Sequence, residues 1–256
     1  MLKKRLIFSL FTDGKYFYLS RNFRLQKVGD LKWLLTNYDF GNVTDNVDEL
    51  IVYNVDRTQV ISSSFLEMVA NLSKLAFVPL TVGGQIRSLT DVNLLVKAGA
   101  DKISICSELK KNYELIYKIK KVYGAQFICA KFDVKIVNGN YKCFVKNGQL
   151  ETTNYIAEAI KKYHENDIGE IHINSIDLDG TGNGLDFNLL KCLPDDLRVP
   201  VVLSGGIGKS DHILQGLSNE QINGVATGHL FNFVGNGLKK ARQTLVNHKV
   251  KVAIFG

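Results

Sequence analysis

Residues Val199–Gly208, which read Val-Pro-Val-Val-Leu-Ser-Gly-Gly-Ile-Gly, hold the pattern that decides the fold. An apolar run of strand length ends in Ser204-Gly205-Gly206, and a helix-length segment then leads to a short strand that ends in Thr227-Gly228. Glycines at such a turn let backbone N–H groups approach an anion, and the following helix adds the positive end of its dipole. The stretch therefore predicts a phosphate-binding turn between a strand and a helix.

The same plan occurs earlier in the chain. Val78–Gly84 is an apolar run that ends in two glycines, and a helix-length segment leads from it to Ala98–Ile105. An internal duplication of this kind predicts a twofold repeat with two phosphate-binding turns on opposite sides of one body. The candidate phosphate-binding residues are Gly83, Gly84, Ser104, Asp179, Gly180, Ser204, Gly205, Gly206, Thr227 and Gly228.

Strand-like apolar runs recur along the whole chain and alternate with helix-compatible segments. Near-continuous apolar strands are typical of parallel sheets that are buried on both faces. Their number and alternation predict a single α/β domain over residues 1–256, a (β/α)8 TIM barrel. The doubly wound open sheet is the rival fold, but its Gly-rich turn would follow the first strand, where this chain has Thr12-Asp13-Gly14. The predicted strands are Arg5–Phe11, Glu49–Val55, Phe77–Val82, Lys102–Cys106, Phe127–Phe132, Glu170–Ser175, Val201–Ser204 and Gly224–Thr227.

Helices are expected at Ser64–Lys74, Leu109–Val122 and Asn154–Tyr163. Lys15–Phe23 follows an Asp-Gly turn and predicts a small hairpin or flap. Lys135–Asn154 holds two Asn-Gly turns, which predict a β-ribbon inserted after strand five. Both insertions follow the carboxyl end of a strand, the face where such barrels have their active sites.

Composition narrows the class of protein. The net charge of +7 comes from scattered lysines without interleaved aromatic residues, so we expect no nucleic-acid partner. The four cysteines have no ligand spacing with histidine, so we expect no metal, no cofactor, no disulfide and a cytoplasmic location. Lys3–Phe11 imitates a signal peptide but lacks a cleavage site and reads better as a buried strand, and no apolar run reaches membrane-spanning length.

Polar residues at strand ends are the candidates for chemistry. Asp133 ends strand five with no glycine beside it, and Asp179 follows strand six, so both are candidate acid–base groups. Asp177 precedes a glycine-rich segment and fits a turn-forming role equally well. His172 alternates with two isoleucines, which favours a place between the barrel and its helices.

Four charged residues open otherwise apolar strands: Arg5, Glu49, Lys102 and Glu170. Two acids and two bases that point inward must pair with one another, because buried charges are not left unpaired. Periodicity alone favours the plainer interpretation, which is four exposed charges at strand ends.

Longer motifs add a resemblance to a known family. They include Pro79–Ser88 (Pro-Leu-Thr-Val-Gly-Gly-Gln-Ile-Arg-Ser), Ala98–Ile105, Ser175–Thr181 (Ser-Ile-Asp-Leu-Asp-Gly-Thr) and Val201–Gly206. With Lys4–Ile7 and Asp48–Leu50, they make the chain resemble, over essentially its whole length, the cyclase subunit of imidazole glycerol phosphate synthase. This resemblance implies a (β/α)8 barrel of histidine biosynthesis.

The resemblance also implies a mechanism. A glutaminase subunit docks on the N-terminal face of the barrel, and its ammonia passes through the barrel to a phosphorylated nucleotide at the other face. Arg5, Glu49, Lys102 and Glu170 match the family's gate for ammonia, which reverses the plainer interpretation. Asp101 matches a residue of the docking rim, and Asp133 matches one of two catalytic aspartates.

The second catalytic aspartate should lie where this chain has Phe11, which cannot transfer a proton. The family's flap lysine is replaced near Tyr18 or Leu19, and Gln85 interrupts the first glycine turn. These departures suggest a divergent paralogue that delivers ammonia for amidination of a surface-polysaccharide or flagellin sugar, with a sugar amidotransferase as a further partner. The alternatives are a genuine histidine-pathway cyclase, with Asp13 or Asp179 as substitute acid, and a non-catalytic scaffold that activates the glutaminase.

Overall fold

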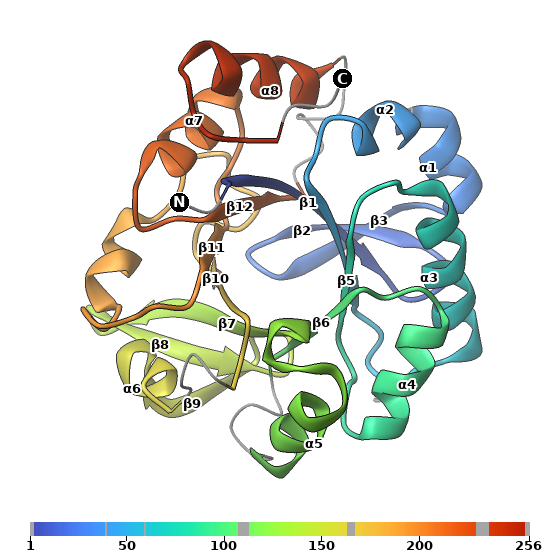
Figure 1. The fold of residues 1–256 in the computed structure, drawn as a ribbon, viewed down its shortest axis with the longest axis horizontal. Helices are drawn as coiled ribbons and strands as arrows, with labels where there is room; N and C mark the ends of the chain where they lie inside the picture. Colours follow the sequence, from blue (N-terminus) through green and yellow to red (C-terminus); the bar gives the residue numbers. More distant parts are fainter. Residues whose placement is uncertain are drawn as a thin grey trace.

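The computed structural model describes residues 3–38, 40–58, 60–106, 113–162, 167–228 and 236–253. Eight parallel strands form a closed circuit in the order β10-β11-β12-β1-β4-β5-β6-β7, and β7 pairs again with β10 (Figure 1). The predicted (β/α)8 barrel is therefore confirmed. Its strands are β1 (Arg5–Thr12), β4 (Glu49–Asn54), β5 (Leu80–Gly83), β6 (Lys102–Ile105), β7 (Ile128–Val137), β10 (Glu170–Ser175), β11 (Val201–Ser204) and β12 (Gly224–Thr227).

Two strand boundaries differ from the prediction by more than one residue, each for a physical reason. β5 begins at Leu80 and not at Phe77, because Phe77 is 90% exposed and Pro79 has no N–H to donate to a neighbouring strand. β7 continues past Phe132 to Val137, because its second half pairs with an inserted strand.

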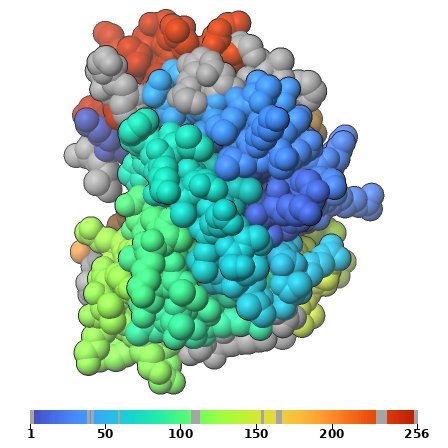
Figure 2. Space-filling model, turned by 90° about the vertical axis from the view of Figure 1, so that its right-hand side faces the viewer, coloured from blue at the N-terminus to red at the C-terminus, as the bar shows by residue number. Residues whose placement is uncertain are grey.

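Helices cover the outside of the barrel, where apolar side chains of the strands meet apolar faces of the helices (Figures 1 and 2). On the flank shown in Figure 2, the blue surface around α1 and the teal surface of α3 and α4 lie side by side. The helices are α1 (Leu31–Tyr38), α2 (Phe40–Thr44), α3 (Ser63–Leu75), α4 (Leu89–Lys97), α5 (Tyr113–Tyr123), α6 (Ile156–Ile160), α7 (Ser210–Ser218) and α8 (Gly237–Asn247). None of the helices in the described ranges is long and apolar enough to cross a membrane.

The helix predictions hold to different degrees. Ser64–Lys74 is confirmed as α3, which starts at the N-cap Ser62 and buries Phe65 and Leu72 on one face. The first part of the Leu109–Val122 prediction lies outside the described residues, and α5 occupies the rest. The prediction at Asn154–Tyr163 began too early, because strand β9 runs to Tyr155 and only Ile156–Ile160 is α-helical.

Two antiparallel insertions rise from the carboxyl ends of strands. β2 (Phe17–Arg21) pairs with the end of β1 and with β3 (Arg24–Gly29), so the segment after strand one is a hairpin. β8 (Asn140–Val145) pairs with the outer half of β7 and with β9 (Leu150–Tyr155). Both insertions therefore stand at the mouth of the barrel, above the residues that end the parallel strands.

Candidate functional site

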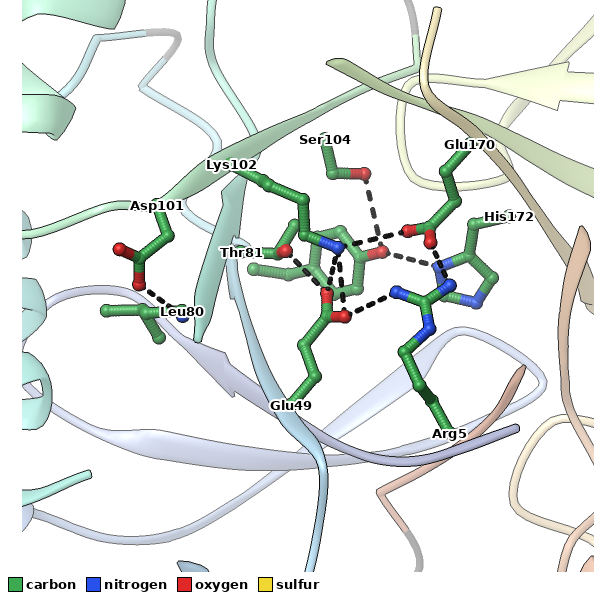
Figure 3. A network of polar contacts seen from close by, with 10 residues as sticks. Arg5, Glu49, Leu80, Thr81, Asp101, Lys102, Ser104, Glu170 and His172 are labelled. Carbon is green, nitrogen blue, oxygen red and sulfur yellow. Dashed lines mark hydrogen bonds and ion pairs between the residues drawn. The ribbon is translucent and has the colours of Figure 1, made fainter. Parts of the chain in front are cut away.

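A closed ring of charges lies at the amino ends of the strands (Figure 3). Arg5 Nη1 is 2.7 Å from Glu49 Oε2, and its other terminal nitrogen pairs with Glu170 Oε2. Lys102 Nζ completes the ring, at 2.8 Å from Glu49 Oε1 and 3.5 Å from Glu170 Oε1. The four side chains come from β1, β4, β6 and β10 and point toward one another inside the barrel. The strand parity explains this, since each residue opens a strand with its side chain on the inner face.

Mutual neutralisation makes the ring stable in a nearly dry place. The side chains of Glu49 and Glu170 are 2% and 6% exposed. Burial alone lowers the pKa of Lys102, but the carboxylates of Glu49 and Glu170 outweigh it and the net pKa is raised. Burial likewise opposes ionisation of Glu170, yet Lys102 and Arg5 hold its pKa below the usual range. Arg5, Lys102 and Glu170 are therefore charged at neutral pH.

Thr81 contacts the ring directly, and Asp101 lies at the same face of the barrel. Thr81 Oγ1 donates a 2.6 Å hydrogen bond to Glu49 Oε1, which orients that carboxylate (Figure 3). Asp101 is exposed just before β6, and its Oδ2 accepts a 2.8 Å bond from the backbone N–H of Leu80. Asp101 thus tightens the start of β5 at the same face of the barrel.

The middle of the barrel contains an apolar layer and, above it, a polar bridge. Ile7, Ile51, Val202 and Ala226 are fully or almost fully buried in one interior cluster with Tyr53. The phenol of Tyr53 lies 2.9 Å from His172 Nδ1, and β4 and β10 are on opposite sides of the strand circuit. The prediction that His172 lies between barrel and helices is therefore wrong, because its alternation with Ile171 and Ile173 turns it inward.

The hydrogen bonds of Ser204 decide which nitrogen of His172 carries the proton. Ser204 donates its single proton to Asn174 Oδ1 at 2.7 Å, so at its 2.7 Å contact with His172 Nε2 it accepts. Burial, followed by the charge of Lys131, lowers the pKa of His172 well below its usual range. The neutral ring therefore carries its proton on Nε2 and accepts from Tyr53 at Nδ1.

Two cavities open at the carboxyl ends of the strands. Cavity A, of about 760 Å³, is bordered by Gly84, Gln85, Ser104, Cys106 and Asp133. Cavity B, of about 350 Å³, is bordered by residues that include Gly205 and Gly206 of the second glycine turn. Five side chains border both cavities and form their common wall: Phe11, Ser20, Phe23, Tyr53 and Lys131. The polar residues around cavity B include Asn174, Asp179, Gly180, Ser204, Gly205, Gly206, Thr227 and Gly228.

The two glycine turns lie opposite each other, because β5 and β11 are separated by four steps of the circuit in either direction. Gly84 has φ +95° and Gly206 has φ +98°, a backbone region that glycine enters without a steric penalty. Gln85 also has a positive φ, of 60°. Gly83 is buried one residue earlier, where a Cβ would meet the Tyr53 ring at 2.9 Å. The turns therefore border two separate cavities, and the prediction of two anion sites stays a prediction.

Asp133 belongs to a buried cluster that the sequence reasoning did not anticipate. Its Oδ1 forms an ion pair with Lys131 Nζ and accepts a 3.4 Å bond from Asn174 Nδ2. Its Oδ2 accepts a long contact of 3.6 Å from the thiol of Cys106. Lys131 and Asp133 are two residues apart on β7, so alternation along that strand was the available signal for Lys131.

Asp179 holds the β2–β3 hairpin over cavity B. Its Oδ2 accepts hydrogen bonds from Ser20 Oγ at 2.5 Å and from the backbone N–H of Phe23 at 3.1 Å. Burial raises the pKa of Asp179, and the bonds from the hairpin only partly offset this. The hairpin also brings Arg21 and Arg24 to cavity B, so cations are present there.

Asp13 is used differently from Asp179. Its Oδ1 accepts from the backbone N–H groups of Lys15 and Tyr16, and its Oδ2 accepts from Tyr18 at 2.6 Å. The carboxylate thus shapes the turn between β1 and β2, and these bonds, opposed by burial, leave its pKa lowered.

Comparison with known proteins agrees with this arrangement. Residues 37–235 match the family described as histidine biosynthesis protein. The "Putative imidazole glycerol phosphate synthase subunit hisF2" of Parasynechococcus marenigrum is 41% identical over 97% of this chain and 92% of its own. Imidazole glycerol phosphate synthase subunit HisF of Phocaeicola vulgatus is 30% identical over 99% of this chain and 100% of its own. The HisF subunit of Leptospira biflexa is 30% identical over 82% and 83%. The chain belongs to the HisF family.

Phe11 forms part of the wall between the two cavities of this HisF-family barrel. Its ring stacks on Tyr53 with 5.9 Å between centroids and 19° between planes, and both rings border both cavities. The end of β1 therefore presents an apolar aromatic surface to both cavities. Among the described residues, no group of three His, Cys, Asp or Glu side chains is arranged to hold a metal ion.

Proposed function

We propose that this HisF-family chain is the barrel subunit of a glutamine amidotransferase that resembles imidazole glycerol phosphate synthase. In this proposal, a glutaminase partner releases ammonia at the amino ends of the strands, and the ammonia travels through the barrel to a ligand at the mouth. The single observation that carries the proposal is the neutral, inward-facing ring of Arg5, Glu49, Lys102 and Glu170 (Figure 3).

The ring has the properties of a gate for a small neutral base. Its longest ion pair, 3.5 Å, joins Lys102 to Glu170, while Lys102 keeps a 2.8 Å contact with Glu49. Lys102 can therefore leave Glu170 and remain paired with Glu49. Ammonia can pass through the resulting gap, whereas an ammonium ion is repelled by the positive charges of Arg5 and Lys102.

The partner surface we propose is the face around the ring. Phe77, which is 90% exposed and lies three residues before the start of β5, offers an aromatic anchor there, and the exposed Asp101 offers a charge. A large aromatic side chain in contact with water is a common energetic centre of a protein interface. A glutaminase that docks on Phe77 and Asp101 would cover the entrance to the ring.

The ligand we propose at the mouth is a phosphorylated small molecule. Cavities A and B together are bordered by six basic side chains and three acidic ones. The six basic side chains are Arg21, Arg24, Arg57, Arg87, Lys131 and Lys146. This excess of positive charge, together with the two glycine turns, favours an anion with more than one phosphate.

Phe11 supports divergence from histidine biosynthesis. Removal of one of two proton-transfer groups costs about 100- to 10,000-fold in rate. We therefore propose that the ammonia serves amidination of a surface-polysaccharide or flagellin sugar, in cooperation with a sugar amidotransferase. Similarity to a relative named hisF2 is compatible with this assignment.

A second function is favoured by Asp179. This carboxyl borders cavity B, and burial raises its pKa, so it can hold a proton that a general acid would donate. A histidine-pathway cyclase would then use Asp133 and Asp179 as its acid–base pair. Asp13 is less suited, because its oxygens are engaged by the β1–β2 turn.

The deciding experiment is turnover of the ribulosyl aminoimidazole nucleotide with ammonium salts. We expect a rate at least 100-fold below that of a cyclase with two aspartates, and we expect Phe11→Asp to raise it by 10-fold or more. Phe11→Leu is the matched control and should change nothing. An equal rate in the unmodified chain would instead support the cyclase function.

The scaffold alternative is tested with the glutaminase. If ammonia is conducted through the barrel, Glu170→Gln should lower turnover with glutamine much more than turnover with ammonium salts. If glutaminase stimulation survives while both turnovers are equally affected, the barrel acts only as an activator.

A further inference from the structure

Lys131 is a buried cation at the centre of the barrel mouth. It projects from β7 on the same inner face as Cys129 and Asp133, and its side chain is 12% exposed. Its Nζ lies 4.7 Å from the centroid of the Tyr53 ring and 5.6 Å from that of Phe23. Contacts with two aromatic faces stabilise an ammonium group that has lost most of its water.

The position of Lys131 is as informative as its burial. It belongs to the common wall of cavities A and B, so its side chain borders both. Cavity A contains the Gly84 turn, and cavity B contains the Gly205-Gly206 turn from the opposite side of the barrel. Lys131 therefore lies between the two candidate phosphate sites.

The chemistry of Lys131 is that of an anchor and not of a nucleophile. Burial lowers its pKa, but the carboxylate of Asp133 outweighs burial and the net pKa is raised. A protonated lysine does not attack a carbonyl group, so imine chemistry is disfavoured. The ammonium group has three N–H donors, and among the described residues one acceptor, Asp133, bonds to it.

We propose that Lys131 is a ligand-binding residue that holds an electronegative oxygen in the middle of a phosphorylated sugar whose two ends occupy the glycine turns. The proposal rests on the phosphorylated ligand proposed above and is independent of ammonia transfer. Asp133 competes with the ligand oxygen for the same ammonium group. The two residues of one ion pair thus have opposite effects on affinity.

Fructose 1,6-bisphosphate is the probe, and inorganic phosphate is its single-anion control. Binding to the full chain is measured by calorimetry at constant ionic strength. We expect Lys131→Met to weaken bisphosphate binding at least 10-fold and Lys131→Arg to weaken it less than 3-fold, because arginine keeps the charge. Asp133→Asn should strengthen binding, because it removes the competing carboxylate.

Matched variants separate binding from folding. Lys142→Met removes a cation that pairs with Glu151 on the β-ribbon, and it should leave the affinity unchanged. If Lys131→Met does not fold, the double variant Lys131→Met/Asp133→Asn removes the uncompensated carboxylate, and its affinity should be at least 10-fold weaker than that of Asp133→Asn.

Three results would overturn the inference. They are bisphosphate binding no tighter than phosphate binding, equal affinity in the Lys131→Met variant, and weaker binding in the Asp133→Asn variant. None of them affects the ammonia-transfer proposal, whose failure would appear in the glutamine-dependent assay.

Discussion

The hydroxyl of Tyr53 lies 2.9 Å from Nδ1 of His172 and joins two strands on opposite sides of the barrel. This bond closes the centre of the barrel between the charged ring and the cavities at the mouth. The ammonia route proposed above therefore requires movement at two levels, at Lys102 and at Tyr53.

Tyr53→Phe removes the donor to His172 and leaves a buried acceptor without its bond. We expect the free energy of unfolding to fall by about 1–2 kcal/mol, measured by urea denaturation at pH 8. Tyr117→Phe is the control, because Tyr117 is 57% exposed on α5. An unchanged stability of Tyr53→Phe would mean that the cross-barrel bond contributes nothing.

Glu170→Gln leaves two cations in the ring with one carboxylate. We expect a loss of about 3–5 kcal/mol at pH 7, as for other buried pairs that lose one partner. The folded-state pKa of Glu170 is lowered, so its contribution is present above its usual pKa of 4.5 and is lost as pH falls below that value. The free energies of unfolding of the wild type and of Glu170→Gln should therefore become equal at acidic pH.

The measurement is a set of urea titrations between pH 7 and pH 3. Glu114→Gln, on the exposed face of α5, should have no measurable effect at any pH. A gap between wild type and Glu170→Gln that stays constant down to pH 3 would argue against the ring's ionised state.

Asp179→Ala should release the β2–β3 hairpin, because it deletes the acceptor for Ser20 and for the N–H of Phe23. Bonds to a charged group contribute about 1.5–3 kcal/mol, so tryptic cleavage after Arg21 and Arg24 should accelerate roughly 10-fold or more. Asp177→Ala is the control, because that carboxylate binds Ile136 of β7 instead. Equal cleavage rates in the two variants would contradict the role of Asp179.

Gly206→Ala tests the second glycine turn. A Cβ there would lie 1.9 Å from the carbonyl oxygen of Gly184, so we expect lower stability and weaker phosphate binding. Gly139→Ala shares the positive φ but points into open space, and it isolates the cost of the backbone conformation, about 1–2 kcal/mol. If Gly206→Ala and Gly139→Ala have the same stability and the same phosphate affinity, the short distance between Gly206 and Gly184 does not matter for folding or binding.

The barrel could be predicted because its strands are nearly continuous apolar runs. β4, for example, has all six residues buried, and such runs are visible without any knowledge of tertiary contacts. Arg5 and Glu170 stood out as charged residues at the start of apolar strands, but periodicity favoured exposed charges, and only the family resemblance predicted an inward-facing gate. The pairing within the ring depends on strand order, which periodicity alone does not contain.

The centre of the mouth could not be predicted in the same way. Tyr53 and His172 look like ordinary strand residues, and their contact spans strands 119 positions apart in the sequence. Lys131 sits between apolar neighbours, and only its parity with Asp133 marks it as inward-facing. The length of α6 was also misjudged, because pairing of β9 with β8 overrides the local helical pattern.

Strand β7 belongs to two structures at once. Asp133 and Val134 pair with β10 of the barrel on one side and with β8 of the ribbon on the other. A protein that binds the β8–β9 ribbon would therefore contact a sheet that shares strand β7 with Lys131 and Asp133. A force applied to the ribbon would be transmitted along the backbone of β7 to the wall between cavities A and B.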